Sequence, residues 1–162
     1  MDYFLNRAWH LMAYMLPKFM VKVVIDTNVF VSAVLSPDGG SREILRQAFK
    51  GDFKPIFSNA LFGEYEALLA RDELWANCSL SASERDALLD ALLSVADWVR
   101  IHFLWRPNLT DEGDNHVLEL AVTGGARAII TSNLRDFRNA ELLFPDIEIF
   151  TPGNFLNWRR KS

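Results

Sequence analysis

The feature that most constrains this chain is an alternation of short β-branched runs with segments of helical pattern, which begins at Val21. Five runs are predicted to be strands: Val21–Ile25, Pro55–Phe57, Trp98–Ile101, Ala128–Thr131 and Ile147–Phe150. Strands that alternate with helices are typical of βαβ units stacked around a parallel sheet. The sequence therefore predicts an α/β fold.

Helical patterns fill the intervals between these runs. They predict helices over Ser41–Phe49, Asn59–Leu69, Ser83–Val95 and Asp114–Thr123, with a short terminal helix after Pro152. Ser83 is the expected N-cap of its helix, because a serine hydroxyl accepts a hydrogen bond from a first-turn N–H group. Gly124 and Gly125 are expected to end the helix before them.

The composition favours one globular domain. The chain has 162 residues, of which 50% are hydrophobic and 23% charged, so burial can offset the entropy of ordering, but the length is short for two domains. Cys78 is the only cysteine, which excludes an intrachain disulfide and favours a reducing cytoplasm. The net charge of −4 disfavours a general electrostatic binder of nucleic acid, but not a site where cations offset clustered carboxylates.

Residues 1–19 are expected to be a peripheral N-terminal extension, ahead of a domain over residues 20–162. The extension is rich in Met, Leu and aromatic residues, but Arg7, His10, Pro17 and Lys18 interrupt them. No membrane-spanning helix and no secretory signal is expected from such a pattern. Two interpretations stay open: an appended amphipathic segment, or an upstream start codon before a core that begins near Met20.

Oxygen-bearing side chains directly follow the first predicted strand. Asp26, Thr27 and Asn28 come at its carboxyl end. In sheets of this kind, ligands bind beyond the carboxyl ends of the strands, near the point where the strand order reverses. A lone aspartate there is usually a turn former or helix cap, but its position favours a functional role.

Glu64 is a second candidate carboxylate. The apolar residues of its predicted helix recur at spacings of three and four: Ala60, Leu61, Ala67 and Leu68. A glutamate that points the same way as this face needs a buried partner or a metal. The alternative, in which Glu64 lies at the edge of the apolar face and reaches water, stays open.

Asp111 and Asp114 lie three residues apart at the start of a later predicted helix. Both carboxylates can project from its first turn. Acidic residues in a first turn are commonly caps or partners of the helix dipole. We assign Asp111 to capping and Asp114 to the functional site.

A last group of polar side chains follows the fourth predicted strand. It consists of Thr131, Asn133 and Asp136. If the strands lie side by side, this group converges with Asp26, Glu64 and Asp114 in one acidic pocket. Carboxylates gathered in a pocket raise one another's pKa values, so the cluster is tolerated chiefly when it holds a hard divalent cation.

Together these motifs resemble the PIN-domain family. The segments that carry the resemblance are Ile25–Asn28, Ser58–Glu64, Asp111–Leu118, Ala128–Phe137 and Thr151–Leu156. The resemblance spans roughly Met20 to Phe155. It depends on four acidic motif positions that occur here in the same order as in the family. It implies an α/β/α sandwich with a five-stranded parallel sheet and Mg²⁺- or Mn²⁺-dependent cleavage of RNA. For small stand-alone members it also implies the role of toxin in a toxin–antitoxin pair.

The resemblance implies a role for each candidate residue. Asp26 and Asp114 would be the principal metal ligands and Glu64 would hold or orient a second ion, so that these three carry catalysis. Asp136 is a further candidate ligand. The supporting residues would be Thr27, Asn28, Asp111, Thr131 and Asn133. Family members often have an aspartate at the position of Asn133, although a subset shows the Asn-x-x-Asp-Phe arrangement of this chain.

Other functions fit less well. A haloacid-dehalogenase type phosphotransferase needs a second acid two residues after Asp26, where Asn28 stands. A histidine-based hydrolase is disfavoured because His10, His102 and His116 share no motif, and His116 is expected on a helix surface. A degenerate PIN-like module that binds RNA or a protein without cutting stays open, supported by Asn133. The expected partners are RNA, a protein antitoxin and a second copy of the chain in a homodimer.

Overall fold

The computed structural model describes residues 20–102, 112–138 and 144–162, without the side chains of 112–114 and 138. Its five strands are β1 (Lys22–Ile25), β2 (Lys54–Phe57), β3 (Asp97–Trp98), β4 (Ala128–Ile130) and β5 (Glu148–Phe150). They form one parallel sheet in the order β3-β2-β1-β4-β5. The α/β class and the five-stranded parallel sheet are confirmed, and the expected N-terminal extension lies outside the described residues.

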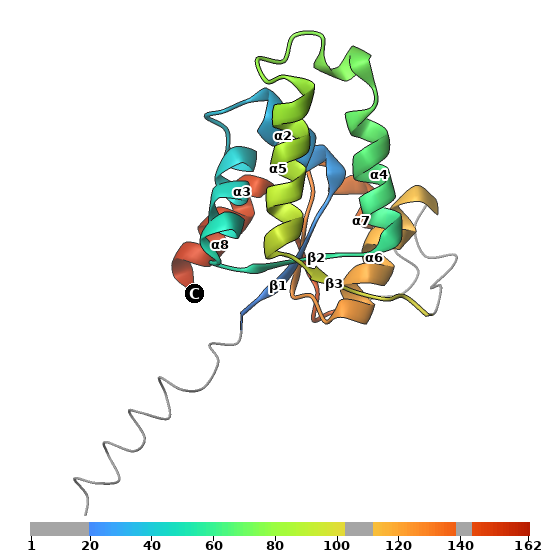
Figure 1. The fold of residues 1–162 in the computed structure, drawn as a ribbon. Helices are drawn as coiled ribbons and strands as arrows, with labels where there is room; N and C mark the ends of the chain where they lie inside the picture. The colour runs from blue at the N-terminus through green and yellow to red at the C-terminus, as the bar shows by residue number, and fades with distance from the viewer. Residues whose placement is uncertain (1–19, 103–111, 139–143) are drawn as a thin grey trace, which may run out of the picture.

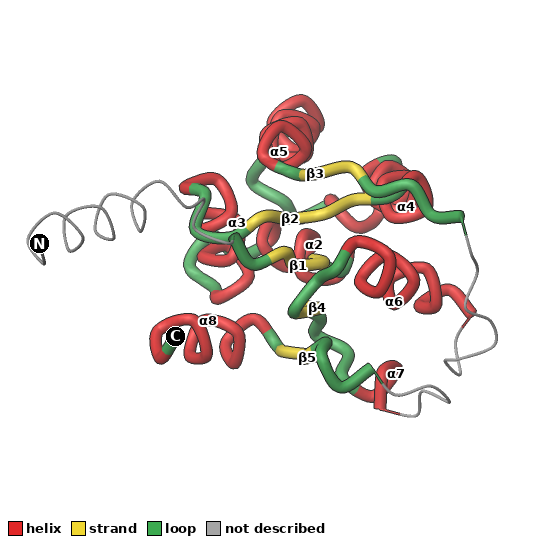
Figure 2. Tube along the Cα trace, turned by 90° about the horizontal axis from the view of Figure 1, so that it is seen from below, coloured by secondary structure: helices red, strands yellow, loops and turns green. Residues whose placement is uncertain are grey.

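The helices are α2 (Thr27–Leu35), α3 (Gly40–Lys50), α4 (Asn59–Leu69), α5 (Ala82–Val95), α6 (Glu112–Gly124), α7 (Arg135–Arg138) and α8 (Pro152–Lys161), with a 3-10 turn η1 (Asp72–Trp75) (Figure 1). In the view of Figure 2, α3 and α8 lie on one side of the sheet and α6 on the other. The sheet is therefore the middle layer of an α/β/α sandwich. No helix within the described ranges is long and apolar enough to cross a membrane.

The central strands β1 and β4 are the most deeply buried part of the sheet. Val23, Val24 and Ile25 pair in register with Ala128, Ile129 and Ile130, and all six are at most 1% exposed. Continuous apolar strands of this kind are expected where helices cover both faces of a parallel sheet. The chain proceeds outward from β1 to β3 and then returns to place β4 on the other side of β1. The strand order therefore reverses between β1 and β4, which is where ligands bind in such sheets.

Helix α2 was not expected from the sequence. Its valines favour a strand by intrinsic propensity, yet the segment is helical and buries Val29, Phe30, Ala33 and Val34 on one side. Asp26 caps its first turn by accepting a hydrogen bond from the Thr27 N–H group. Tertiary burial and this cap outweigh the strand preference. The short η1 and α7 were likewise not expected.

The boundary predictions near helix ends were partly wrong. Ser81, and not Ser83, is the N-cap of α5, because Ser81 and Glu84 form a reciprocal capping box. Gly125 ends α6 with a positive φ of 69°, as the glycine pair predicted. Strand β3 is shorter than predicted and ends at Trp98, although the Val99 N–H group still donates to the Phe57 carbonyl at 2.8 Å.

Candidate active site

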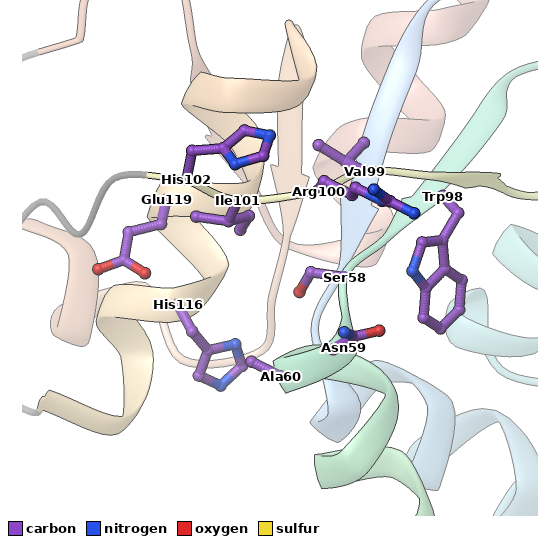
Figure 3. Close-up of a pocket in the computed structure, with 10 residues that line it drawn as sticks. All are labelled: Ser58, Asn59, Ala60, Trp98, Val99, Arg100, Ile101, His102, His116 and Glu119. Atoms are coloured by element: carbon purple, nitrogen blue, oxygen red, sulfur yellow. The ribbon is translucent and has the colours of Figure 1, made fainter.

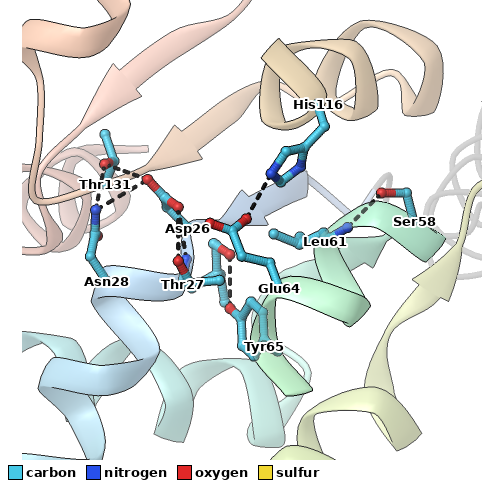
Figure 4. A network of polar contacts seen from close by, with 10 residues as sticks. Asp26, Thr27, Asn28, Ser58, Leu61, Glu64, Tyr65, His116 and Thr131 are labelled. Carbon is cyan, nitrogen blue, oxygen red and sulfur yellow. Dashed lines mark hydrogen bonds and ion pairs between the residues drawn. The ribbon is translucent and has the colours of Figure 1, made fainter. Parts of the chain in front are cut away.

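Asp26 and Thr131 meet at the point where the strand order reverses. Asp26 directly follows β1 and Thr131 directly follows β4, and the Asp26 N–H group donates to the Ile130 carbonyl at 2.9 Å. The Thr131 hydroxyl donates to Asp26 Oδ2 at 2.8 Å (Figure 4). Parallel pairing of β1 with β4 thus brings together two residues that lie 105 positions apart. The predicted convergence of these two strand ends is present.

Burial makes the Asp26 carboxylate electrostatically unusual. The residue is only 4% exposed, and loss of hydration raises its pKa above the usual aspartate value, assisted by the negative charge of Glu64. Hydrogen bonds from Thr131 and Thr27 and the charge of His116 act in the opposite direction but do not cancel the effect of burial. A cation beside this carboxylate would offset the cost of its ionised form.

Asn28 holds the two strand ends in a fixed relation. Its Nδ2 group donates to Asp26 Oδ2 at 3.1 Å and to Thr131 Oγ1 at 3.2 Å, and its Oδ1 accepts from the Ser132 N–H group at 3.0 Å. Both ends of the amide are therefore used. Asn28 and Thr131 therefore both bond to Asp26, while their supporting roles at a metal site stay predictions.

Tyr65 is a site residue that the sequence reasoning missed. Its hydroxyl donates to the Ile25 carbonyl at 2.8 Å, directly before Asp26, and its ring contacts Phe30 and Phe57. Burial raises the pKa of the phenol well above its usual value, so it stays a neutral donor. The tyrosine ties α4, which carries Glu64, to the end of β1. The signal was available, because Leu61 and Tyr65 lie four residues apart on one helix face.

The apolar face predicted for α4 was partly wrong. Leu61 and Tyr65 are buried, whereas Ala60 and Ala67 are exposed. The helix therefore turns a different face to the core from the one expected. Glu64 lies at the margin of that face with 40% of its side chain exposed, which matches the alternative that stayed open.

His116 was wrongly expected on a helix surface. Its side chain is 15% exposed, and its Nε2 atom lies 2.7 Å from Glu64 Oε2 (Figure 4). The Nδ1 atom is buried and has no hydrogen-bond partner in the described part of the chain. α6 thus contributes His116 to the same cluster as Asp26 and Glu64.

The two remaining acidic candidates on this side are described only in part. Asp114 is the third residue of α6, which places its backbone in the first turn, two residues before His116. Its side chain and the whole of Asp111 lie outside the described residues. The roles assigned to these two aspartates therefore stay predictions.

Asn133 and Asp136 are held to each other and to Thr131. The Asn133 N–H group donates to Thr131 Oγ1 at 3.1 Å, and the Asn133 side-chain amide donates to Asp136 Oδ2. The predicted fourth group is therefore connected to Asp26 through Thr131. Whether Asp136 ligates a metal stays a prediction.

Comparisons with known proteins assign the family. A family model described as a PIN domain matches residues 22–135, from the start of β1 to the start of α7. The match takes in more than half of the chain. This chain belongs to the PIN-domain family. PIN domains are generally nucleases that use divalent metal ions.

One solved structure with this PIN-domain fold is that of VapBC2 from Rickettsia felis, bound to a DNA fragment from their promoter. The likeness covers 80% of this chain and 97% of the VapBC2 chain, with a TM-score of 0.54 and 14% sequence identity. At that identity the likeness establishes the fold alone. Comparison with curated protein sequences gave no match.

The donors at this PIN-domain site suit a hard divalent cation. Asp26 and Glu64 supply carboxylate oxygens, and Thr27 and Thr131 add hydroxyl oxygens, which are the donor types that Mg²⁺ and Mn²⁺ prefer. Within the described ranges, no three His, Cys, Asp or Glu side chains are grouped closely enough to hold a metal. The set is therefore compatible with a metal centre and needs a further carboxylate, the role predicted for Asp114.

Two hollows flank the PIN-domain site. A groove of about 670 Å³ between α2 and α4 includes Asn28, Val31, Leu35, Glu64 and Arg71. A cavity of about 540 Å³ lies beside the end of β3 and is lined in part by Trp98 and His116 (Figure 3). Glu64 and His116, which contact each other, therefore separate the two hollows. A polymer bound across the carboxylates would have room on both sides.

Proposed function

We propose that this PIN-domain protein is a metal-dependent endoribonuclease that cleaves single-stranded RNA and acts in the cytoplasm as the toxin of a toxin–antitoxin pair. The observation that carries the proposal is the buried Asp26 carboxylate at the point where the strand order reverses. Thr131 donates a hydrogen bond to it, and the negative charge of Glu64 helps to raise its pKa. A buried carboxylate beside a second negative charge is costly for stability and typical of a catalytic site.

In the proposed mechanism, Asp26, Glu64 and Asp114 hold Mg²⁺ or Mn²⁺, with Asp136 as a further ligand. When bound, the cations would activate a water molecule and stabilise the leaving oxygen of an in-line phosphodiester cleavage. Thr27, Thr131 and Asn28 keep the Asp26 carboxylate in one orientation, and Tyr65 keeps the end of β1 against α4. The water oxygen bonds to phosphorus as the bond to the 3′ oxygen breaks, which leaves a 5′-phosphate and a 3′-hydroxyl.

The proposed role as a toxin is supported by the fold shared with a chain of VapBC2. That structure contains VapBC2 bound to a DNA fragment from their promoter. We further propose that the nuclease domain comprises residues 20–162 and that the protein is a homodimer. Sizing by light scattering tests the dimer, and a small reading frame next to the gene is the first candidate antitoxin.

The proposal is tested by cleavage of labelled single-stranded RNA with Mg²⁺, Mn²⁺ or EDTA. Asp26→Asn and Asp114→Asn should each lower the rate more than about 100-fold while the protein stays folded, because even groups that only support a metal ligand are worth 10–100-fold. Asp90→Asn, an exposed position on α5, is the matched control and should retain full activity.

Three results would count against the proposal. One is metal-independent cleavage, a second is full activity in either site variant, and a third is unfolding of both variants in the way that a core cavity would cause. RNA binding by the wild type without any turnover would instead favour the catalytically inactive PIN-like module, for which Asn133 is the supporting feature.

A further inference from the structure

The cavity beside the end of β3 combines an exposed aromatic ring with basic side chains. Its polar and aromatic lining comes from the end of β3 and the residues after it, the start of α4 and the face of α6: Ser58, Asn59, Trp98, Arg100, His102, His116 and the acidic Glu119 (Figure 3). Its volume of about 540 Å³ falls within the range of small-ligand sites. The nuclease mechanism above assigns no role to this space.

Trp98 is a rigid and accessible platform at the edge of the sheet. Half of the residue is exposed, at 50%. Its ring stacks on Phe57, with centroids 6.5 Å apart and planes 14° from parallel, and contacts Phe62 edge to face at 5.7 Å. A ring that its neighbours already hold in place loses little conformational entropy when a ligand stacks on it.

The residues after Trp98 alternate in exposure. Trp98, Arg100 and His102 are exposed, whereas Val99 and Ile101 pack against the core. The residues from Val99 to His102 continue beyond the end of β3, and all of them line the cavity together with Trp98 (Figure 3). A guanidinium two residues from a stacking ring is the combination that proteins use for the phosphate and base of a single strand.

The cavity adjoins the carboxylate cluster through His116. His116 lines the cavity, and its Nε2 atom lies 2.7 Å from Glu64 Oε2. Glu64 in turn acts on Asp26 through its charge. A strand whose scissile phosphate lies at Asp26 and Glu64 would therefore place a neighbouring nucleotide at this cavity.

We propose that this cavity is a nucleotide subsite, in which one unstacked base of a single-stranded RNA next to the scissile phosphate stacks on Trp98 while Arg100 contacts the backbone phosphate. This subsite deepens the proposed nuclease function and rests on it. Stacking on an aromatic face tolerates every base, so the subsite selects single strands over duplexes and imposes little sequence preference.

The test uses a fluorescein-labelled single-stranded RNA of about twelve nucleotides, which spans a typical single-strand site. Steady-state cleavage is measured for the wild type, Trp98→Ala, Trp98→Phe and Arg100→Gln. Arg46→Gln is the control, because Arg46 is exposed, pairs with Glu43 on α3 and lines neither hollow. Circular dichroism verifies that each variant is folded.

Trp98→Ala should raise KM about tenfold, since a stacked base is worth ~1–3 kcal/mol, and Trp98→Phe should retain most of the affinity. Arg100→Gln should raise KM and flatten its salt dependence. The decisive readout is a set of RNAs with one abasic position each. An abasic position next to the cleaved bond should raise the KM of the wild type about tenfold. It should leave the KM of Trp98→Ala unchanged, because the abasic position and the substitution remove the same contact.

An unchanged KM in Trp98→Ala would overturn the proposed subsite, and so would an abasic position that raises KM equally in both proteins. Neither result would contradict the proposed nuclease function. If the wild type cleaves no RNA, fluorescence anisotropy in EDTA measures binding of the labelled RNA to the wild type and to Trp98→Ala. Binding that Trp98→Ala loses supports the subsite and refutes the nuclease, whereas no binding refutes both. A Trp98 variant that fails only to bind a partner protein would assign the cavity to that protein and overturn its assignment to RNA.

Discussion

Asp26 performs two tasks that conflict energetically. As the N-cap of α2 its carboxylate accepts a backbone hydrogen bond, which stabilises the helix. As a buried charge next to Glu64 it destabilises the metal-free protein, and this is expressed as a raised pKa. The conflict is typical of active sites, where residues serve function at some cost in stability.

The raised pKa of Asp26 predicts how stability depends on pH without metal. Above the ordinary value of 3.8 and below the raised pKa, the folded protein keeps a proton that the unfolded chain has lost. The contribution of Asp26 to the free energy of unfolding therefore falls as pH rises through this window. Asp26→Asn removes that contribution, so its stability relative to the wild type should increase with pH and then level off.

Denaturant melts in EDTA at several pH values measure this difference, and at neutral pH the variant should melt slightly higher. The lost Asn28 contact lowers the stability of the variant by the same amount at every pH, so the slope with pH isolates the charge. Asp90→Asn is the control. A difference that is constant with pH, or that changes in the opposite direction, would contradict the burial argument.

Asn133 and Asp136 lead to a second prediction at this scale. An amide oxygen can ligate a hard cation but supplies no charge, and the Asn133 amide already donates to Asp136. Asn133→Asp should tighten Mn²⁺ binding, whereas Asp136→Asn should weaken it and slow cleavage at limiting metal. Calorimetric titration measures both affinities. If neither variant changes the affinity, the segment lies outside the metal site, and Asp26, Glu64 and Asp114 hold the ions alone.

At the scale of elements, the start of α5 shows that two nearby serines, Ser81 and Ser83, have different roles in capping the helix. The Ser81 hydroxyl accepts from the Glu84 N–H group at 3.2 Å, and the Glu84 side chain accepts from the Ser81 N–H group at 2.7 Å. Within the described part of the chain, the Ser83 side chain forms a hydrogen bond only with the Ser81 hydroxyl, at 3.3 Å. The capping box, and with it the helix boundary, therefore depends on Ser81.

We predict that Ser81→Ala lowers the free energy of unfolding by about 1 kcal/mol, the usual cost of losing an N-cap. Ser83→Ala should change it by less than about 0.5 kcal/mol, as expected for an exposed position without such a role. Urea denaturation of the two variants measures the difference. Equal effects would show that the capping box contributes nothing to stability.

Helices α2 and α4 show how packing determines which faces are functional. α2 forms despite its valines because it is capped by Asp26 and buried. α4 turns Leu61 and Tyr65 inward, so that Glu64 lies at the margin of the buried face, where it contacts His116 of α6. Three elements that are distant in the sequence thereby bring their polar side chains to one place.

At the scale of the whole molecule, all five strands of the sheet and every candidate ligand come after residue 20. We therefore predict that a chain starting at Met20 keeps a cooperative unfolding transition and the cleavage activity of the full chain. Thermal melts and the RNA assay on both chains measure this. Loss of soluble, cooperatively folding protein would show that residues 1–19 pack into the core or complete an obligate dimer.

The sequence by itself determined the α/β class, most of the strands and the position of Asp26 at the end of the first strand, because β-branched runs and a carboxylate after such a run are local signals. Its motifs also indicated the PIN-domain family. Local signals could not predict the hydrogen bond from Tyr65 to Ile25, the contact of His116 with Glu64 or the cavity at Trp98, since these features join elements that are distant in the sequence. Only the tertiary structure decided them, because the burial of a helix face and the meeting of side chains depend on the strand order, which places β4 beside β1.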